Sequence, residues 1–311
     1  MRLTETPPTL SAVAGDDTPP PRPAEAHAPV YAPPEAADPP LTVIEGRNWW
    51  SAADAREVWR FRELFYFLTL RDIKLRYKQT IFGVGWSVFQ PLATVVVFAV
   101  FFGSMGKIAD GFAGDYTLFV LCGVLPWTYF ANATTNAANS LVGNERLVTK
   151  TYFPRVLLPA SNVGAATFDF AIGLIVLAVW LVVAGPPPTW RLLLAPVLVA
   201  LLAFTAFGFG TLLSALIATQ RDFRYLLTFG MQLWMFATPC IYLPAQTYGP
   251  RAQTYLQLNP LYGLILNGRN CLLGEPIAWP ALFVSAAFAA AIVGFGLMYF
   301  RRVENTMADT L

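Results

Sequence analysis

The chain has 311 residues, of which 56% are hydrophobic and 13% are charged, and its net charge at neutral pH is +2. A soluble domain normally carries about a quarter of charged residues, so this composition indicates an integral membrane protein. The small net charge argues against a nucleic-acid partner. The single histidine and the three dispersed cysteines argue against a metal or redox site.

Residues 1–48 differ in composition from the rest of the chain. Eleven of the 25 prolines fall within the first 40 positions, among alanine, glutamate and aspartate. Such a segment cannot bury enough apolar surface to offset its ordering entropy. We therefore expect a disordered cytoplasmic tail, and it lacks the basic start and apolar core of a secretory signal.

Residues 49–80 are expected to hold an amphipathic helix, over about 53–78, that lies in the membrane interface. Its apolar residues share one side and would face the acyl chains: Val58, Phe61, Leu64, Phe65 and Leu68. Its last turns carry four cations, which would lie near anionic lipid headgroups and anchor the chain: Arg71, Lys74, Arg76 and Lys78. The alternative is a soluble helix packed on another domain.

Six apolar runs follow within residues 81–302, each long enough for the ~20 residues that cross a bilayer. They lie near 84–106, 116–140, 158–184, 192–218, 225–243 and 279–300. Pro239 breaks the fifth run. The stretch 244–277 is too long for a turn, and its middle, LYGLILNG, is too short to span, so re-entrant or interfacial helices fit best. The predicted fold is an all-α membrane protein with six transmembrane helices and a short cytoplasmic C-terminus, 303–311.

The cations near the span ends give the orientation. With the N-terminus inside, eleven of them lie on the inner side: Arg71, Lys74, Arg76, Lys78, Arg146, Lys150, Arg155, Arg221, Arg224, Arg301 and Arg302. Four lie on the outer side: Lys107, Arg191, Arg251 and Arg269. The bias predicts that both termini are cytoplasmic.

Some positions inside the spans are not lipid-facing in character. The second half of the second run, TYFANATTNAANS, is too polar for lipid and must face protein or water. Asp169 is an acidic residue well inside the third run, and it is either part of a transport path or a structural carboxylate bonded to a neighbouring helix. In the fourth run, small residues recur every four positions and predict close helix packing: Ala206, Gly210, Ser214 and Ala218. Gln90 and Pro91 could bend the first run and turn an amide inward.

No motif for catalysis or nucleotide binding is present in the sequence. It has no phosphate-binding loop, no G-x-S-x-G and no H-E-x-x-H. We therefore predict no catalytic residues and no cofactor in this chain, so active transport would need energy from another polypeptide. The charged loop 144–155, NERLVTKTYFPR, either forms a short cytoplasmic helix on which a motor docks, with Arg146, Leu147 and Lys150 outward, or is a plain polar loop.

Four blocks of sequence resemble the membrane subunit of the type-2 ABC exporters of polysaccharides, which serve O-antigen, capsule and teichoic acid. The blocks are LTLRDIKLRYKQTIFGVGWSVFQPL, GVLPWTYFANATTNAANSLVGNERLVTKTYFPRVLLP, QRDFRYLLTFGMQLWMFATPCIY and LNPLYGLILNGR. They cover most of residues 60–302 in the family's order. The tail 1–48 has no counterpart.

The resemblance implies a homodimer with a central channel in a bacterial inner membrane. It also implies two copies of a separate nucleotide-binding subunit, driven by Mg-ATP, and a glycan cargo on a polyprenyl diphosphate lipid. The four cations Arg71, Lys74, Arg76 and Lys78 would then either attract the diphosphate headgroup of this lipid or only anchor the chain in the membrane. Coupling to the ATPase would use Asn144, Glu145, Arg146, Leu147, Val148, Lys150, Tyr152, Phe153, Arg155, Arg221 and Asp222.

A sugar chain has C–H faces on which aromatic rings can stack. The rings that would line the channel, with two amides, are Tyr77, Phe82, Trp86, Phe89, Gln90, Trp127, Tyr129, Asn132, Phe229, Trp234, Phe236 and Tyr242. Each ring alone could instead contact lipid or pack in the protein. Three other functions stay open: an exporter of a drug or small lipid, a membrane enzyme acting on lipid-linked sugars, and a passive channel or scramblase.

Overall fold

The computed structural model describes residues 52–78, 80–83, 85–98, 100, 116–240, 256 and 258–304, and these ranges contain helices and no strand. The predicted tail 1–48, residues 101–115 and 241–255, and residues 305–311 lie outside the described residues. The helices, in chain order, are α1 (Ala52–Arg60), α2 (Arg62–Tyr77), α3 (Gly85–Phe98), α4 (Tyr116–Ala138), α5 (Ser140–Gly143), α6 (Glu145–Lys150), α7 (Leu157–Ala184), the 3-10 helix η3 (Trp190–Leu194), α8 (Ala195–Thr219), α9 (Phe223–Ala237), α11 (Tyr262–Leu273) and α12 (Trp279–Glu304).

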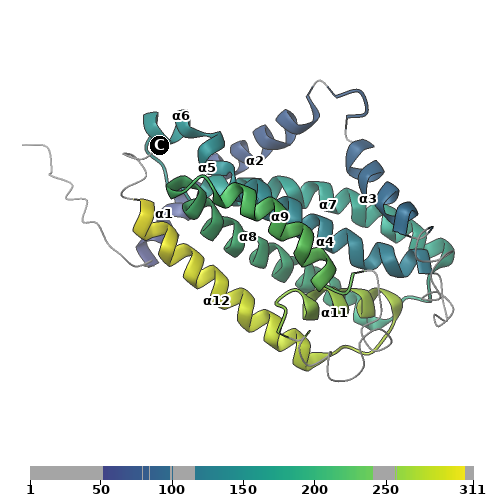
Figure 1. The fold of residues 1–311 in the computed structure, drawn as a ribbon. Helices are drawn as coiled ribbons and strands as arrows, with labels where there is room; N and C mark the ends of the chain where they lie inside the picture. Colours follow the sequence, from purple (N-terminus) through teal and green to yellow (C-terminus); the bar gives the residue numbers. More distant parts are fainter. Residues whose placement is uncertain are drawn as a thin grey trace, which may run out of the picture. The chain divides into compact units, whose positions relative to one another are not determined.

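Four of the described segments are long and apolar enough to cross a membrane: α4, α7, η3 with α8, and α12. They coincide with the second, third, fourth and sixth predicted spans. Figure 1 shows these helices running along one another, with α6 at one end and α11 at the other. The chain is therefore an integral membrane protein whose described residues form helices and no strand.

The first and fifth predicted spans are represented by shorter helices. α3 has 14 residues and α9 has 15, fewer than a bilayer crossing needs, and the remaining parts of both predicted spans lie mostly outside the described residues. α9 ends at Ala237, and Thr238 is extended. A proline disfavours helical backbone at the residue before it, so Pro239 ends this helix as predicted.

α4 is the central helix of the bundle. It contacts α3, α7, α8, α9 and α11, and most of its surface is buried inside the chain, whereas the other three long helices remain largely exposed. Most residues of its polar half are buried or line a cavity, as predicted for this run. Hydrogen-bonding groups at membrane depth need such surroundings, because lipid offers them no partner.

Small residues bring α8 close to both of its neighbours. A Cβ added to Gly210 would lie 2.5 Å from the Cβ of Ala137 on α4. A Cβ added to Gly296 on α12 would lie 2.7 Å from the carbonyl oxygen of Gly208. The predicted stripe is buried along α8, so its role in close packing is confirmed.

The predicted N-terminal helix is divided at Phe61 into α1 and α2. Its apolar stripe does not face lipid. Leu68 is buried in a cluster with Phe153, Leu158 and Phe300, and the other stripe residues pack against the same cluster. The expected contact of this stripe with acyl chains is therefore wrong, because the stripe covers the end of the helix bundle. A different side is exposed and carries Trp59, Tyr66, Phe67 and Leu75.

Candidate functional site

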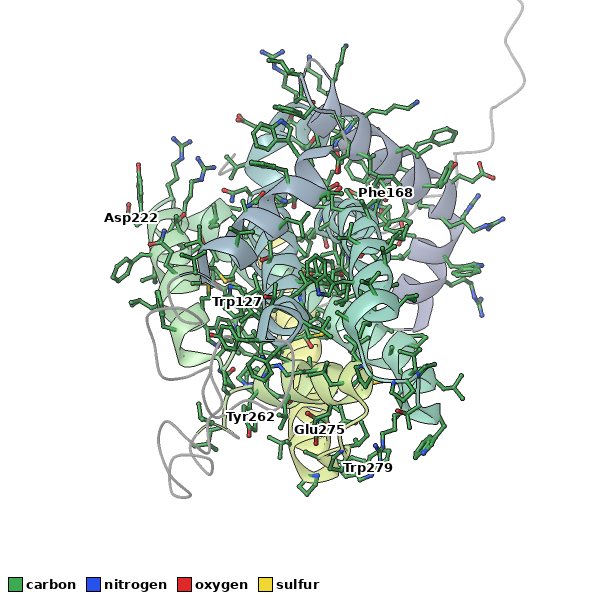
Figure 2. The ribbon with its side chains drawn as sticks, turned by 90° about the vertical axis from the view of Figure 1, so that its right-hand side faces the viewer. Trp127, Phe168, Asp222, Tyr262, Glu275 and Trp279 are labelled. Atoms are coloured by element: carbon green, nitrogen blue, oxygen red, sulfur yellow. The ribbon has the colours of Figure 1, made fainter. Side chains whose placement is uncertain are left out.

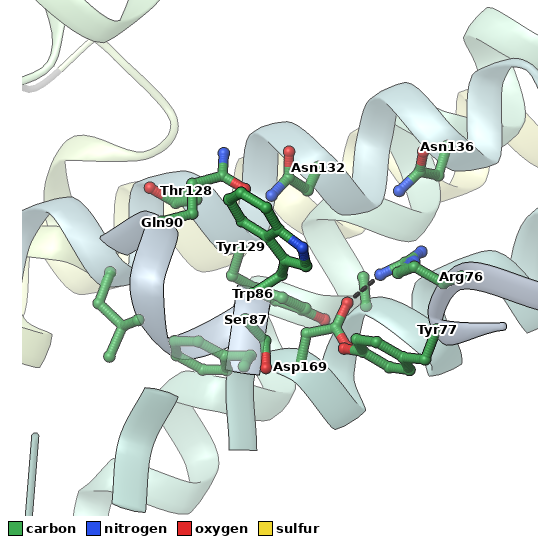
Figure 3. A pocket seen from close by; sticks show the side chains of 13 residues that line it. Arg76, Tyr77, Trp86, Ser87, Gln90, Thr128, Tyr129, Asn132, Asn136 and Asp169 are labelled. Carbon is green, nitrogen blue, oxygen red and sulfur yellow. Dashed lines mark hydrogen bonds and ion pairs between the residues drawn. The ribbon is translucent and has the colours of Figure 1, made fainter. Parts of the chain in front are cut away.

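A cavity of about 300 Å³ opens between the end of α2, the start of α3, α4 and α7. Figure 3 shows side chains from all four segments around it. The lining residues are Arg76, Tyr77, Trp86, Ser87, Gln90, Leu125, Thr128, Tyr129, Asn132, Asn136, Ala166, Asp169 and Phe170. Five of the twelve predicted channel residues are therefore brought together here: Tyr77, Trp86, Gln90, Tyr129 and Asn132.

The turn between α2 and α3 brings the lining residues at the end of α2 and those at the start of α3 to the same cavity. Gly83 lies in this turn with a φ of 52°, a conformation that glycine adopts without the steric penalty of a Cβ. The chain then enters α3, whose first turns supply Trp86, Ser87 and Gln90. Gln90 thus lines the cavity, as predicted for an amide turned inward.

Asp169 on α7 is bonded to two residues at the end of α2. Its two carboxylate oxygens contact the guanidinium of Arg76 and the hydroxyl of Tyr77 (Figure 3). Burial, together with the hydrogen bond to Asp169, raises the pKa of Tyr77 to about 12, so its hydroxyl stays protonated and donates to the carboxylate. Asp169 is thus a carboxylate bonded to a neighbouring helix, which is one of its two predicted roles. It also lies on the cavity wall.

The aromatic part of the wall comes from α3, α4 and α7. Tyr129 stacks on Phe170, with ring centroids 4.6 Å apart, and its hydroxyl lies 2.9 Å from the hydroxyl of Thr167. Trp86 packs edge-to-face between Phe82 and Phe89, at centroid distances of 5.4 and 5.6 Å. All three rings are exposed, and of the three only Trp86 lines the cavity.

The other predicted channel rings lie elsewhere. Trp127 is buried in the core (Figure 2), where it packs against Phe130 and Trp234. The indole N–H of Trp234 donates to the side chain of Asn259 at 3.1 Å. Trp127 and Trp234 therefore pack inside the protein, which was the predicted alternative to lining the channel. Phe229 and Phe236 are exposed on α9, and Tyr242 lies outside the described residues.

The four predicted headgroup cations are in two different situations. Arg71 pairs with Asp72 at 2.8 Å, and Arg76 pairs with Asp169. Lys74 and Lys78 are exposed, and neither has a carboxylate partner among the described residues. Half of the cationic cluster is thus neutralised within the chain.

The predicted coupling loop contains the short helix α6, which is one of the two alternatives for this segment. Glu145, Arg146 and Lys150 are exposed on it. The expectation that Leu147 points outward is wrong, because it packs against the cluster that contains Val148 and Phe153.

The other predicted coupling residues lie beside α6 or between α8 and α9, and some are bonded to the bundle end while others are exposed. Arg155 donates to the carbonyl of Glu304 at the end of α12, at 2.6 Å. Tyr152 is 75% exposed and lies 3.4 Å from the carboxylate of Glu57. Asn144, between α5 and α6, donates to the carbonyl of Ser140 at 2.8 Å. Arg221 and Asp222, between α8 and α9, are exposed, and Figure 2 shows Asp222 at an edge of the bundle.

Sequence reasoning missed the role of Arg269 on α11, which it counted as an outer-side cation. Its guanidinium is buried, lies 3.8 Å from the ring centroid of Phe119, and donates to the carbonyls of Pro239 and Cys240 at 3.0 and 2.8 Å. Burial lowers the pKa of Arg269 to about 10, so it remains charged at neutral pH. An arginine within the apolar stretch LILNGRNCLL was the signal that could have revealed this buried clamp.

Comparison with known proteins agrees with this architecture. The family described as "ABC-2 type transporter" matches residues 63–266. The O-antigen export system permease protein RfbA of Klebsiella pneumoniae is 27% identical over 251 residues, which is 80% of this chain and 95% of the relative. The protein of the same name from Myxococcus xanthus is 28% identical over 211 residues, which is 68% of this chain and 80% of the relative.

Proposed function

Because this chain belongs to the ABC-2 type transporter family, we propose that it is the membrane subunit of an ATP-driven polysaccharide exporter. The observation that carries this proposal is the similarity, along most of the chain, to permeases named for O-antigen export. The cavity supports it, since aromatic rings and amides are groups that contact the faces and hydroxyls of sugars.

The energy would come from a separate nucleotide-binding subunit that uses Mg-ATP, because this sequence has no phosphate-binding loop. We place its docking surface on α6, with a second contact at Arg221 and Asp222. Exposed Arg146 and Lys150 offer charge to a partner, while Val148 and Phe153 are buried and hold α6 on the bundle. A push on α6 would therefore reach α7, which starts seven residues after α6 ends.

The assembly would contain two copies of this chain and two ATPase subunits in a bacterial inner membrane. We propose six spans per chain, with α3 and α9 belonging to the first and fifth, and both termini in the cytoplasm. The excess of inner-side cations supports this orientation. α9 presents an exposed apolar face with Leu226, Phe229, Leu233 and Phe236, and a large apolar face of this kind suits contact with a second copy.

The cargo would be a glycan attached to a polyprenyl diphosphate. A diphosphate needs cations that are not already paired, and Lys74 and Lys78 meet that condition among the described residues of the cluster. Arg71 and Arg76 are less suitable, because a carboxylate already occupies each of them.

Copurification tests this proposal. The full chain should bring down an ATPase subunit in equal amount from solubilised membranes, and the complex should hydrolyse ATP. The double variant Arg146→Ala/Lys150→Ala should lose the ATPase or uncouple it, whereas Arg302→Ala, an exposed cation on α12, should not. A chain that purifies alone without ATPase activity would instead favour a passive pathway or a membrane enzyme.

A further inference from the structure

Three polar residues of α4 form a ladder on the cavity wall. Thr128, Asn132 and Asn136 are spaced by four residues, so they share one face of the helix at steps of about 6 Å along its axis. All three line the cavity, and Figure 3 shows them along one side of it. We call these residues the α4 ladder.

The α4 ladder differs from other asparagines of the chain in its hydrogen bonds. Asn139 donates to the carbonyl of Thr135 at 2.8 Å, and Asn162 donates to the carbonyl of Leu158 at 3.0 Å. Within the described part of the chain, the side chains of the α4 ladder form no hydrogen bond with one another or with any other group. Each asparagine amide keeps two donors and an acceptor for water or a ligand in the cavity.

The cavity carries two opposite charges that cancel. Arg76 and Asp169 are the charged residues of its lining, and they pair with each other. Tyr77 adds a neutral hydroxyl donor to the same carboxylate. A charged ligand would find no uncompensated counter-charge among these lining residues, while a neutral polyol would find amides, hydroxyls and the rings of Trp86 and Tyr129.

We propose, on the basis of the exporter function proposed above, that the α4 ladder binds the hydroxyls of an uncharged stretch of glycan as the polymer passes. The Arg76–Asp169 pair keeps this part of the path electrically neutral. The inference adds a substrate class, a neutral polysaccharide, and a set of residues that selects it.

The α4 ladder is tested in a host whose own copy of this chain is deleted, with the ATPase partner present. Asn132→Leu/Asn136→Leu removes two amides at nearly constant volume, and each lost hydrogen bond is worth about 1 kcal/mol. The amount of surface glycan should therefore fall by about tenfold or more. Asn139→Leu is the matched control, because its amide is already bonded to its own helix, and it should change the amount by less than about twofold.

The outcomes separate this inference from the proposed function. Normal surface glycan with the ladder variant, when deletion of the chain abolishes it, would overturn the inference and leave the exporter function standing. Surface glycan that survives deletion of the chain would overturn the exporter function. Membrane abundance and ATPase copurification of each variant would show whether a loss is instead due to failed folding. In that case Asn132→Ser, which keeps a hydroxyl, is measured in place of the double variant, and it should restore part of the export that the double variant loses.

A binding measurement tests the charge part of the inference. The purified full chain in lipid nanodiscs is titrated with maltoheptaose, a neutral oligosaccharide, and with an oligogalacturonate of the same length, and binding is followed by saturation-transfer NMR. The neutral probe should bind more strongly than the anionic probe to Lys74→Ala/Lys78→Ala, which lacks the exposed lysines proposed above for a phosphate. Adding Asp169→Asn, which leaves Arg76 unpaired, should improve binding of the anionic probe. Equal or stronger binding of the anionic probe to Lys74→Ala/Lys78→Ala, or no saturable binding of maltoheptaose, would overturn the charge part of the inference.

Discussion

The contact between α8 and α4 gives a prediction whose size follows from one distance. A methyl group at position 210 would lie 2.5 Å from the Cβ of Ala137, whereas carbon atoms pack best at about 3.5–4.0 Å. The substitution Gly210→Ala therefore requires a shift of about 1 Å between two helices that also touch elsewhere. Overpacking of this kind costs about 1–3 kcal/mol, and the higher helix propensity of alanine offsets at most about 1 kcal/mol of it.

The matched control is Gly294→Ala on α12, where an added methyl group meets nothing within 4 Å. This variant gains helix propensity without a clash, so it should be at least as stable as the wild type. The assay is reversible unfolding of the purified full chain in mixed detergent micelles, compared as free energies of unfolding. The reasoning fails if Gly210→Ala is as stable as Gly294→Ala, because α4 and α8 would then separate at no measurable cost.

Three further predictions concern other parts of the chain. Arg269→Met removes the donor from two buried carbonyl groups, so it should lower the free energy of unfolding by about 1–3 kcal/mol, and unchanged stability in the same micelles would contradict the clamp. Trp86→Ala should reduce surface glycan without loss of ATPase copurification. The reduction should be larger than with Phe89→Ala, because Trp86 alone of the two lines the cavity. Equal reductions would contradict a special role of the cavity-lining ring. The three cysteines are buried, so native membranes treated with N-ethylmaleimide should show little labelling of this chain until a denaturant is added, and full labelling before unfolding would show that the bundle opens.

Four of the six predicted spans are present as long helices, and they were predictable because a long apolar run has few other uses. Each of α7, α8 and α12 contains a long stretch of high mean hydropathy, and their predicted limits lie close to the observed ones. The end of α9 was also predictable, since it depends on the local chemistry of Pro239, whereas the charged segment that forms α6 is compatible with either a short helix or a plain polar loop.

Contacts between distant segments could not be read from the sequence in the same way. The stripe of α2 has the same pattern whether lipid or protein covers it, and the cluster that receives it, with Phe153 and Phe300, comes from the ends of other helices. The same limit applies to the aromatic rings. Trp127 and Tyr129 are two residues apart on α4, yet Trp127 is packed in the core while Tyr129 borders the cavity.

The cations before the first predicted span show most clearly why a local charge pattern is ambiguous. As a sequence, Arg71, Lys74, Arg76 and Lys78 form one block, and the whole block is a candidate for an anionic headgroup. In the structure, a neighbouring carboxylate neutralises Arg71, and Asp169, 93 residues further along the chain, neutralises Arg76. The positive charge offered to an anion is therefore that of two lysines on the exposed side. The charge of Arg76 belongs to the cavity, where it balances Asp169. One run of cations thus contributes to two different surroundings: Arg76 to an electrically neutral cavity wall, where we propose that a sugar binds, and Lys74 and Lys78 to an exposed cationic surface, which we propose for a phosphate.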